Sequence, residues 1–260
     1  MARIFVVANQ KGGVGKTSVA VNLAASLAHY KRRVLLADLD PQGNATTGSG
    51  VDKTACAQTI YGVLLGEHSI RDAIVAAEGG YDVLPSNREL AGAEVELIGI
   101  ERREYRLRDA LVDAKDYDFI IIDCPPALNM LTVNGFTAAD AVIIPMQCEY
   151  YALEGLTALV DTIEQIKAGP NPGLEIDGIL RTMFDPRNNL ANEVSAQLIE
   201  HFREKVFRTI IPRNVRLAEA PSFGQSIFDY AGDSHGATDY RALAEEVIAR
   251  VGSNAESRAA

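Results

Sequence analysis

The most constraining feature of the sequence lies near its start, where an apolar run, a glycine-rich segment and a helical pattern follow one another. Residues Ile4–Ala8 are continuously apolar and predict a buried strand, while Lys16–Tyr30 gathers its apolar side chains on one helical face. Between them lies Gln10–Thr17, which reads QKGGVGKT. Glycines let backbone N–H groups approach a ligand closely, and a helix N-terminus attracts anions. A strand, a glycine-rich loop and a helix in this order predict a phosphate-binding site.

Individual residues of this loop have predicted roles. We expect Lys16 to bind the β- and γ-phosphates of a nucleotide and Thr17 to bind a magnesium ion. The residues expected to bind nucleotide are Gly12, Gly13, Val14, Gly15, Lys16, Thr17 and Ser18. The loop departs from the common pattern, because Gln10 stands where a glycine is usual and Lys11 adds a second lysine. Lys11 is badly placed for its own nucleotide, so it is either a solvated surface lysine or a contact to a nucleotide on a facing subunit.

Two further apolar runs end in carboxylates. Asp38 and Asp40 follow the predicted strand Val34–Ala37, and Asp123 follows the predicted strand Phe119–Ile122. Ligands of wound α/β sheets bind at the carboxyl ends of the strands. We therefore expect Asp40 and Asp123 to act on magnesium, and Asp40 also to orient an attacking water. For Asp38 a purely structural role in the following turn stays open.

The remainder of the chain alternates short apolar strands with helical patterns. Because the strands are continuously apolar, they predict a mostly parallel sheet with helices on both faces, hence a wound α/β fold. The further predicted strands are Tyr81–Leu84, Ala141–Ile144, Ile176–Met183 and Val206–Ile211. The further predicted helices are Ala152–Ala168 and Thr238–Val251, and the range Asn87–Asp113 is predicted to be mostly helical. With 260 residues, 47% of them hydrophobic, the chain suits one domain over residues 1–252 followed by a flexible tail over residues 253–260.

Charge and cysteine content limit the classes of function. The chain has 25 basic and 35 acidic side chains, a formal net charge of −10, which excludes a generally basic nucleic-acid coat. DNA binding would need a local basic patch, and the segment His201–Arg216 has five basic residues against one acidic residue. The three cysteines form no C-x-x-C pair, which argues against a disulfide framework and a standard zinc site. A signal peptide and a membrane-spanning stretch are not apparent, so a cytoplasmic protein is expected.

Taken together, the motifs resemble the deviant Walker ATPases and, more narrowly, the ParA/Soj chromosome-partitioning ATPases. The resemblance extends from about Arg3 to Val251 and implies a P-loop NTPase fold of the deviant Walker A type. The motifs that carry it are KGGVGKT, LLADLDPQGN, IIIDCPP, AGAEVEL at Ala91–Leu97, PMQCEYYALEGL at Pro145–Leu156 and IIPRNVRLAEAPSFG at Ile210–Gly224. The last two motifs are the most specific to ParA/Soj proteins.

This resemblance implies a function. ATP and Mg²⁺ make such a protein a sandwich dimer that binds double-stranded DNA without sequence preference, on the nucleoid. A ParB-type partner stimulates its weak ATPase and releases it from DNA. Lys11 matches the lysine that crosses to the phosphates of the partner subunit, and Gly12 matches the point where the two loops approach. Asp40 matches the acid needed for hydrolysis, and Asp123 matches the Walker B acid.

The resemblance also assigns residues outside the phosphate loop. Pro212 and Arg213 match the segment beside the adenine, although a plain strand-to-helix turn is the alternative. Arg187 and Arg216 match basic positions that the family uses for DNA, although a solvated or salt-bridged surface is the alternative. The chain departs from the family at two positions where relatives commonly have a basic residue, Gln225 and His235.

Rival interpretations remain. A membrane-positioning ATPase of the MinD kind needs a basic amphipathic helix, whereas acidic residues outnumber arginines in Thr238–Val251, so no stable membrane association is expected. A redox protein like the nitrogenase iron protein needs two exposed cysteines per chain to hold an iron–sulfur cluster. Cys124 directly follows Asp123 and does not lie in the later loop that such a cluster needs. A metabolic P-loop enzyme, a ligase or kinase for a small molecule, would need a substrate pocket that the sequence does not indicate. A positioning ATPase for a protein cargo would have the same core motifs.

Overall fold

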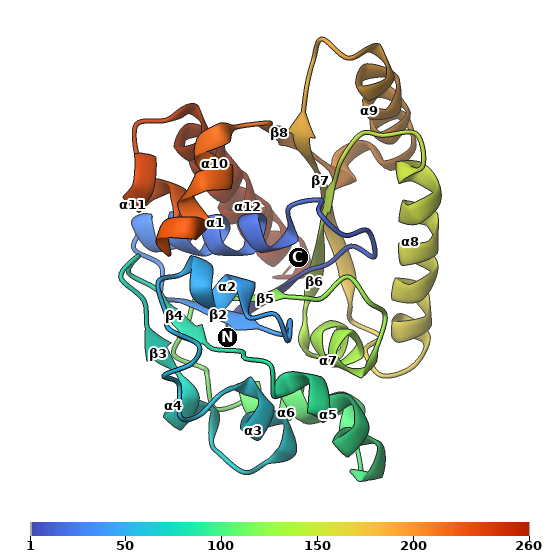
Figure 1. Cartoon of the computed structure of the whole chain (residues 1–260). Helices are drawn as coiled ribbons and strands as arrows, with labels where there is room; N and C mark the ends of the chain where they lie inside the picture. Colours follow the sequence, from blue (N-terminus) through green and yellow to red (C-terminus); the bar gives the residue numbers. More distant parts are fainter. Residues whose placement is uncertain (1, 260) are drawn as a thin grey trace.

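The computed structural model describes residues 2–259, with side chains for residues 2–253. Its centre is a sheet in the order β3-β4-β2-β5-β1-β6-β7-β8, in which only the β3–β4 pair is antiparallel (Figure 1). The strands are β1 Arg3–Val7, β2 Val34–Asp38, β3 Val75–Ala76, β4 Asp82–Leu84, β5 Phe119–Asp123, β6 Ala141–Met146, β7 Glu175–Phe184 and β8 Val206–Pro212. The predicted wound α/β fold with a mostly parallel sheet is confirmed.

Helices cover both faces of the sheet and enclose two apolar cores. Phe5 and Val7 of β1 face one of these cores, whereas Val6 faces the other. Both faces of each central strand are thus buried, which explains the continuously apolar runs. The α-helices are α1 Lys16–His29, α2 Asn44–Gly48, α3 Ile60–Leu65, α4 Ile70–Ala73, α5 Leu90–Glu96, α6 Arg106–Leu111, α7 Met130–Ala138, α8 Ala152–Ala168, α9 Asn189–Phe202, α10 Val215–Glu219, α11 Ile227–Ala231 and α12 His235–Ala259. Short 3₁₀ helices span Leu97–Gly99, Arg103–Tyr105, Arg203–Lys205 and Ala220–Phe223.

Several helices differ from their predicted ranges. The range Asn87–Asp113, predicted to be mostly helical, contains α5, α6 and two 3₁₀ helices, interrupted by a turn in which Arg102 has a left-handed φ of 54°. At the C-terminus, α12 begins before Thr238 and continues to Ala259, well beyond the predicted end at Val251. The flexibility of residues 253–260 stays a prediction, as does the domain boundary at residue 252.

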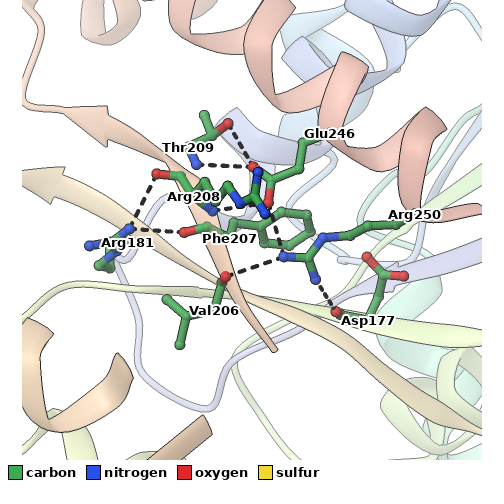
Figure 2. Close-up of polar contacts among 8 residues, drawn as sticks. All are labelled: Asp177, Arg181, Val206, Phe207, Arg208, Thr209, Glu246 and Arg250. Atoms are coloured by element: carbon green, nitrogen blue, oxygen red, sulfur yellow. Dashed lines mark hydrogen bonds and ion pairs between the residues drawn. The ribbon is translucent and has the colours of Figure 1, made fainter. Parts of the chain in front are cut away.

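The edge strand β8 is irregular, and charged side chains satisfy its backbone (Figure 2). Arg181 of β7 donates to the carbonyls of Phe207 and Arg208 at 2.9 and 3.3 Å. Glu246 of α12 accepts from the Arg208 N–H at 2.9 Å and from the Arg250 guanidinium at 2.9 Å. The Glu246 contacts fix β8 to α12, and the Arg181 contacts fix it to β7. They also hold the strand whose carboxyl end carries the predicted adenine segment.

Candidate functional site

The predicted phosphate-binding loop connects β1 to α1 at the carboxyl edge of the sheet (Figure 1). Gly13 and Gly15 have φ angles of 75° and 90°, in the left-handed region that glycine adopts without steric cost. A Cβ atom on Gly12 or Gly13 would meet no heavy atom of the described residues within 4 Å. From β7, the Thr182 hydroxyl donates to the carbonyl of the buried Val14 at 2.8 Å. The loop is therefore anchored on its inner side and open on its outer side.

The first turn of α1 carries the cation predicted to bind phosphates. Lys16 is 7% exposed, and its Nζ donates to the Lys11 carbonyl at 3.1 Å. Burial lowers the pKa of Lys16, and the carboxylates of Asp123 and Asp40 oppose that shift. Thr17 and Ser18 are half-buried in the same turn. A phosphate oxygen would replace the Lys11 carbonyl and would also meet the free N–H groups of the helix N-terminus.

Two buried carboxylates lie side by side behind this lysine. Asp38 and Asp123 are paired residues of β2 and β5, and both are 0% exposed. Neither carboxylate oxygen of Asp123 has a hydrogen-bond partner among the described residues. Burial and the neighbouring Asp38 raise the pKa of Asp123, whereas the nearby Thr17 hydroxyl favours its charged form. A buried carboxylate with free oxygens beside a threonine hydroxyl fits a magnesium ion that also binds nucleotide oxygens.

Asp38 and Asp40 have different surroundings. Asp38 accepts hydrogen bonds from the Thr46 N–H and hydroxyl at 2.8 and 2.7 Å, so it holds the start of α2 in place. Burial raises the pKa of Asp38 to about 6. Asp40 is half-buried, and its Oδ1 accepts from the Gln42 N–H at 2.9 Å. The structure thus gives Asp38 the structural role that stayed open and leaves Asp40 as the accessible carboxylate.

Lys11 lies on the outer rim of the loop. Its Nζ forms an ion pair with Glu149, and its side chain is 45% exposed. Its N–H donates to the Asn9 side chain at 2.9 Å. Sequence reasoning missed Glu149, which follows β6, because nothing in the local pattern links it to the phosphate loop. The ion pair means that Lys11 is not a merely solvated lysine in this structure.

Comparisons with known proteins identify the family. The family model described as an AAA domain matches residues 2–176. The chain is 51% identical over 252 residues to the chromosome partitioning protein ParA of Caulobacter vibrioides, covering 95% of this chain and 94% of that protein. It is 53% identical over 249 residues to the chromosome-partitioning ATPase Soj of Thermus thermophilus, covering 96% of each. The chain belongs to the ParA/Soj family of chromosome-partitioning ATPases.

A solved structure supports the nucleotide chemistry of this ParA/Soj site. Cobyrinic acid a,c-diamide synthase from Mycobacterium smegmatis, with bound ATP analog and magnesium, matches with a TM-score of 0.86 and 37% identity. The match covers 98% of this chain and 97% of that chain. An ATP analog and magnesium are thus bound to a structural relative, and ATP and Mg²⁺ fit the open loop, Lys16 and the free oxygens of Asp123 described above.

The segments beyond the phosphate loop lie near the same edge of the ParA/Soj fold. Pro212 and Arg213 are exposed where β8 ends, before α10. A residue that sequence reasoning missed, Met183, has a left-handed φ of 49° and lies near Gly15, with its Cε 3.7 Å from the position of a Cβ there. Strained backbone of this kind concentrates at functional sites. The sequence gives no sign of this backbone conformation at Met183, because methionine rarely adopts it.

The two arginines predicted to bind DNA are exposed but already paired. Arg187, following β7, is 88% exposed and makes two hydrogen bonds of 2.9 Å to the Asp185 carboxylate, which lower the pKa of Asp185 to about 2. Arg216 of α10 is 60% exposed and lies 3.3 Å from the Glu219 carboxylate. Its guanidinium also lies 6.0 Å from the centre of the Tyr230 ring. The salt-bridged alternative therefore describes both arginines in this state of the protein.

Among the residues that the structure describes, no helix combines the length and apolar character needed to cross a membrane.

Proposed function

We propose that this protein is a DNA-partitioning ATPase whose ATP-bound form is a sandwich dimer that binds double-stranded DNA without sequence preference. A ParB-type partner stimulates its otherwise weak ATPase and thereby releases it from DNA. In this proposal the protein is cytoplasmic and associates with the nucleoid only when ATP is bound. The observation that carries the proposal is the division of the phosphate loop into a buried lysine, Lys16, and an exposed lysine, Lys11.

Within one subunit, the residues suit hydrolysis of ATP. Lys16 exchanges the Lys11 carbonyl for phosphate oxygens, and Thr17 and Asp123 hold Mg²⁺, which neutralises charge on the phosphates. Asp40 lies at the accessible side and orients the attacking water. Pro212 and Arg213 border the adenine. Positioning and charge neutralisation are what phosphoryl transfer mainly requires, so this set is sufficient for a slow ATPase.

Dimer formation is supported by the outer side of the loop. Gly12 has open space where a side chain would be, so its lack of a side chain is not required by packing within the subunit. A glycine that the subunit itself does not need suits a close approach of a second copy. Lys11 lies beside it and is exposed, so it can reach a nucleotide that is held by that copy.

DNA binding must overcome the overall charge of the chain. A net charge of −10 repels DNA, so Arg187 and Arg216 have to act within about one Debye length, ~8 Å at physiological salt. Dimerisation doubles the repulsion and the number of these arginines. Binding to DNA phosphates releases counterions, so affinity falls steeply with salt.

The test is binding of the Asp40→Ala protein to a duplex of random sequence, with ATP or with ADP, over a series of salt concentrations. Binding with ATP alone, weakening steeply with salt, is the expected result. A stable ATP dimer without DNA affinity would contradict the DNA track and favour a protein cargo or a membrane surface. Co-sedimentation with anionic vesicles then separates those two.

The similarity to a protein named as a cobyrinic acid a,c-diamide synthase raises a second function, synthesis of a small-molecule amide. The 51–53% identity to partitioning ATPases over nearly the whole chain, against 37% to that protein, favours partitioning. ATP turnover that depends on cobyrinic acid and glutamine, and not on DNA or a partner protein, would reverse this preference.

A further inference from the structure

The segment that joins β6 to α8, residues 147–151, lies against the phosphate loop at two points. Glu149 forms the ion pair with Lys11, and the Gln147 side-chain amide donates to the Gly13 carbonyl at 3.3 Å. Just before this segment, the Pro145 carbonyl accepts from the buried Asn9 side chain at 2.8 Å. The base of the segment is thus fixed to the loop by a buried contact, whereas the Glu149 contact lies at the surface.

The Glu149 side chain can leave Lys11 while the neighbouring Cys148 stays buried in the core. Tyr150 and Tyr151, which follow Glu149, are 73% and 72% exposed and pack mainly on each other, with ring centroids 4.9 Å apart. Glu149 itself is 53% exposed. Breaking the Lys11–Glu149 ion pair therefore exposes no buried apolar surface, and its cost is the modest one of a surface ion pair.

Lys11 cannot contact Glu149 and a phosphate of a second subunit at the same time. We propose that Glu149 is a positioning residue that retains Lys11 in the isolated subunit and must release it before the ATP dimer forms. This inference rests on the proposed function, in which Lys11 crosses to the nucleotide of the partner. The several negative charges of a triphosphate compete for the lysine better than one carboxylate does, and a nucleotide lacking the γ-phosphate competes less well.

The proposal makes dimerisation sensitive to Glu149. Glu149→Gln keeps the size of the side chain but removes its charge, so Lys11 is free before a partner arrives. Removing one surface ion pair changes an equilibrium by up to about fivefold, and two such pairs break per dimer. We therefore expect the dimer dissociation constant with ATP to fall roughly 2- to 30-fold, measured by analytical ultracentrifugation in the Asp40→Ala background. The matched control is Glu154→Gln, which removes the same charge from an exposed position on α8.

A second measurement uses the nucleotide-free monomer and does not require dimerisation. N-hydroxysuccinimidyl acetate acetylates accessible lysines, and peptide mass spectrometry reports the rate at Lys11 relative to the exposed Lys115. Glu149→Gln should raise this ratio about two- to fivefold, and Glu154→Gln should leave it unchanged. A general loss of structure would raise labelling at every lysine rather than change the ratio.

The outcomes separate this inference from the proposed function. If Glu149→Gln leaves the labelling ratio unchanged, or if it weakens the ATP dimer, retention of Lys11 by Glu149 is overturned. If Asp40→Ala forms no dimer with ATP even when Glu149 is intact, the proposed function fails instead.

Discussion

The nucleotide edge and the two arginines proposed to bind DNA, Arg187 and Arg216, lie near the same end of the sheet, yet they are built in opposite ways. At the nucleotide edge, Lys16, Asp38 and Asp123 are buried. Lys16 stands at the start of α1, and the two aspartates are paired at the ends of β2 and β5. Arg187 and Arg216 are exposed, and a nearby acid pairs with each of them. A buried site depends on single residues, because each buried charge has few partners. An exposed surface acts through the sum of its charges, so each residue contributes little.

The sharpest test of the first region is Asp40→Ala. Removing the carboxylate that orients the attacking water should lower ATP turnover by about 10²–10³-fold, the scale of losing one precisely placed polar group at a reacting centre. Because Asp40 is half-buried and does not hold the phosphates, ATP binding should persist. Phosphate release measures turnover, and titration with a fluorescent ATP analogue measures binding. Turnover at the wild-type rate would remove Asp40 from the mechanism.

Gly12→Val asks whether the outer side of the loop belongs to the subunit or to its partner. A Cβ atom at Gly12 meets no heavy atom of the described residues beyond its chain neighbours within 4 Å, so the folded monomer should keep its melting temperature and bind ATP. Two valines at a close dimer contact should weaken dimerisation at least about 30-fold, given the usual cost of overpacking. Size-exclusion chromatography with light scattering measures the dimer. A normal ATP dimer would show that the two loops do not approach each other here.

Asp123→Asn tests how far a buried, charged carboxylate lowers the free energy of unfolding. An acid whose pKa is raised on folding binds more protons in the native state, so stability falls as pH rises from its unfolded pKa through its folded pKa. Folding raises the pKa of Asp38 to about 6 and also raises the pKa of Asp123. The wild-type protein should therefore lose stability as the pH rises from about 4 to beyond 6. Asp123→Asn should therefore be more stable at pH 8, by about 1–3 kcal/mol, with the gain vanishing in acid.

Urea unfolding of the nucleotide-free protein from pH 5 to pH 8 measures this gain, and Asp113→Asn, at an exposed position, is the control. The same Asp123→Asn protein should lose most of the stabilisation that Mg²⁺ and ATP give, because a magnesium ligand is gone. A variant that is less stable at pH 8 would mean that the Asp123 carboxylate stabilises the empty site.

The sequence predicted the wound α/β fold with its mostly parallel sheet. Lys16 and Asp123 could be located because they stand at a helix start and at a strand end, and their roles stay predictions. The Lys11–Glu149 pair could not be found, because it joins residues 138 positions apart. The range Asn87–Asp113 is mostly helical as predicted, but its apolar spacing does not reveal the turn at Arg102 that separates α5 from α6.

Other misses also have local physical causes. Helix α9 was not predicted, although the Asn188 side chain accepts hydrogen bonds from the N–H groups of Leu190 and Ala191 and so caps it. Asparagine at a helix start is a real signal, but it is equally common in turns. Arg187 and Asp185 are two residues apart in the sequence, so their pairing could have been inferred from their opposite charges.

Arg216→Glu tests the second region, and here the expected effect is the smallest. Reversing one charge should weaken DNA binding of the ATP-bound Asp40→Ala protein about three- to tenfold at low salt, and less at higher salt, because the remaining cations still attract phosphates. ATP binding and dimerisation should not change, since Arg216 is exposed on α10 and lies against Glu219 and Tyr230. Fluorescence anisotropy with a labelled duplex measures the affinity.

Glu219→Gln is the informative counterpart, because it removes the acid that pairs with Arg216 and should strengthen binding about twofold. If Arg216→Glu abolished DNA binding outright, the surface would depend on single residues as the nucleotide edge does, and the contrast between the two regions would fail.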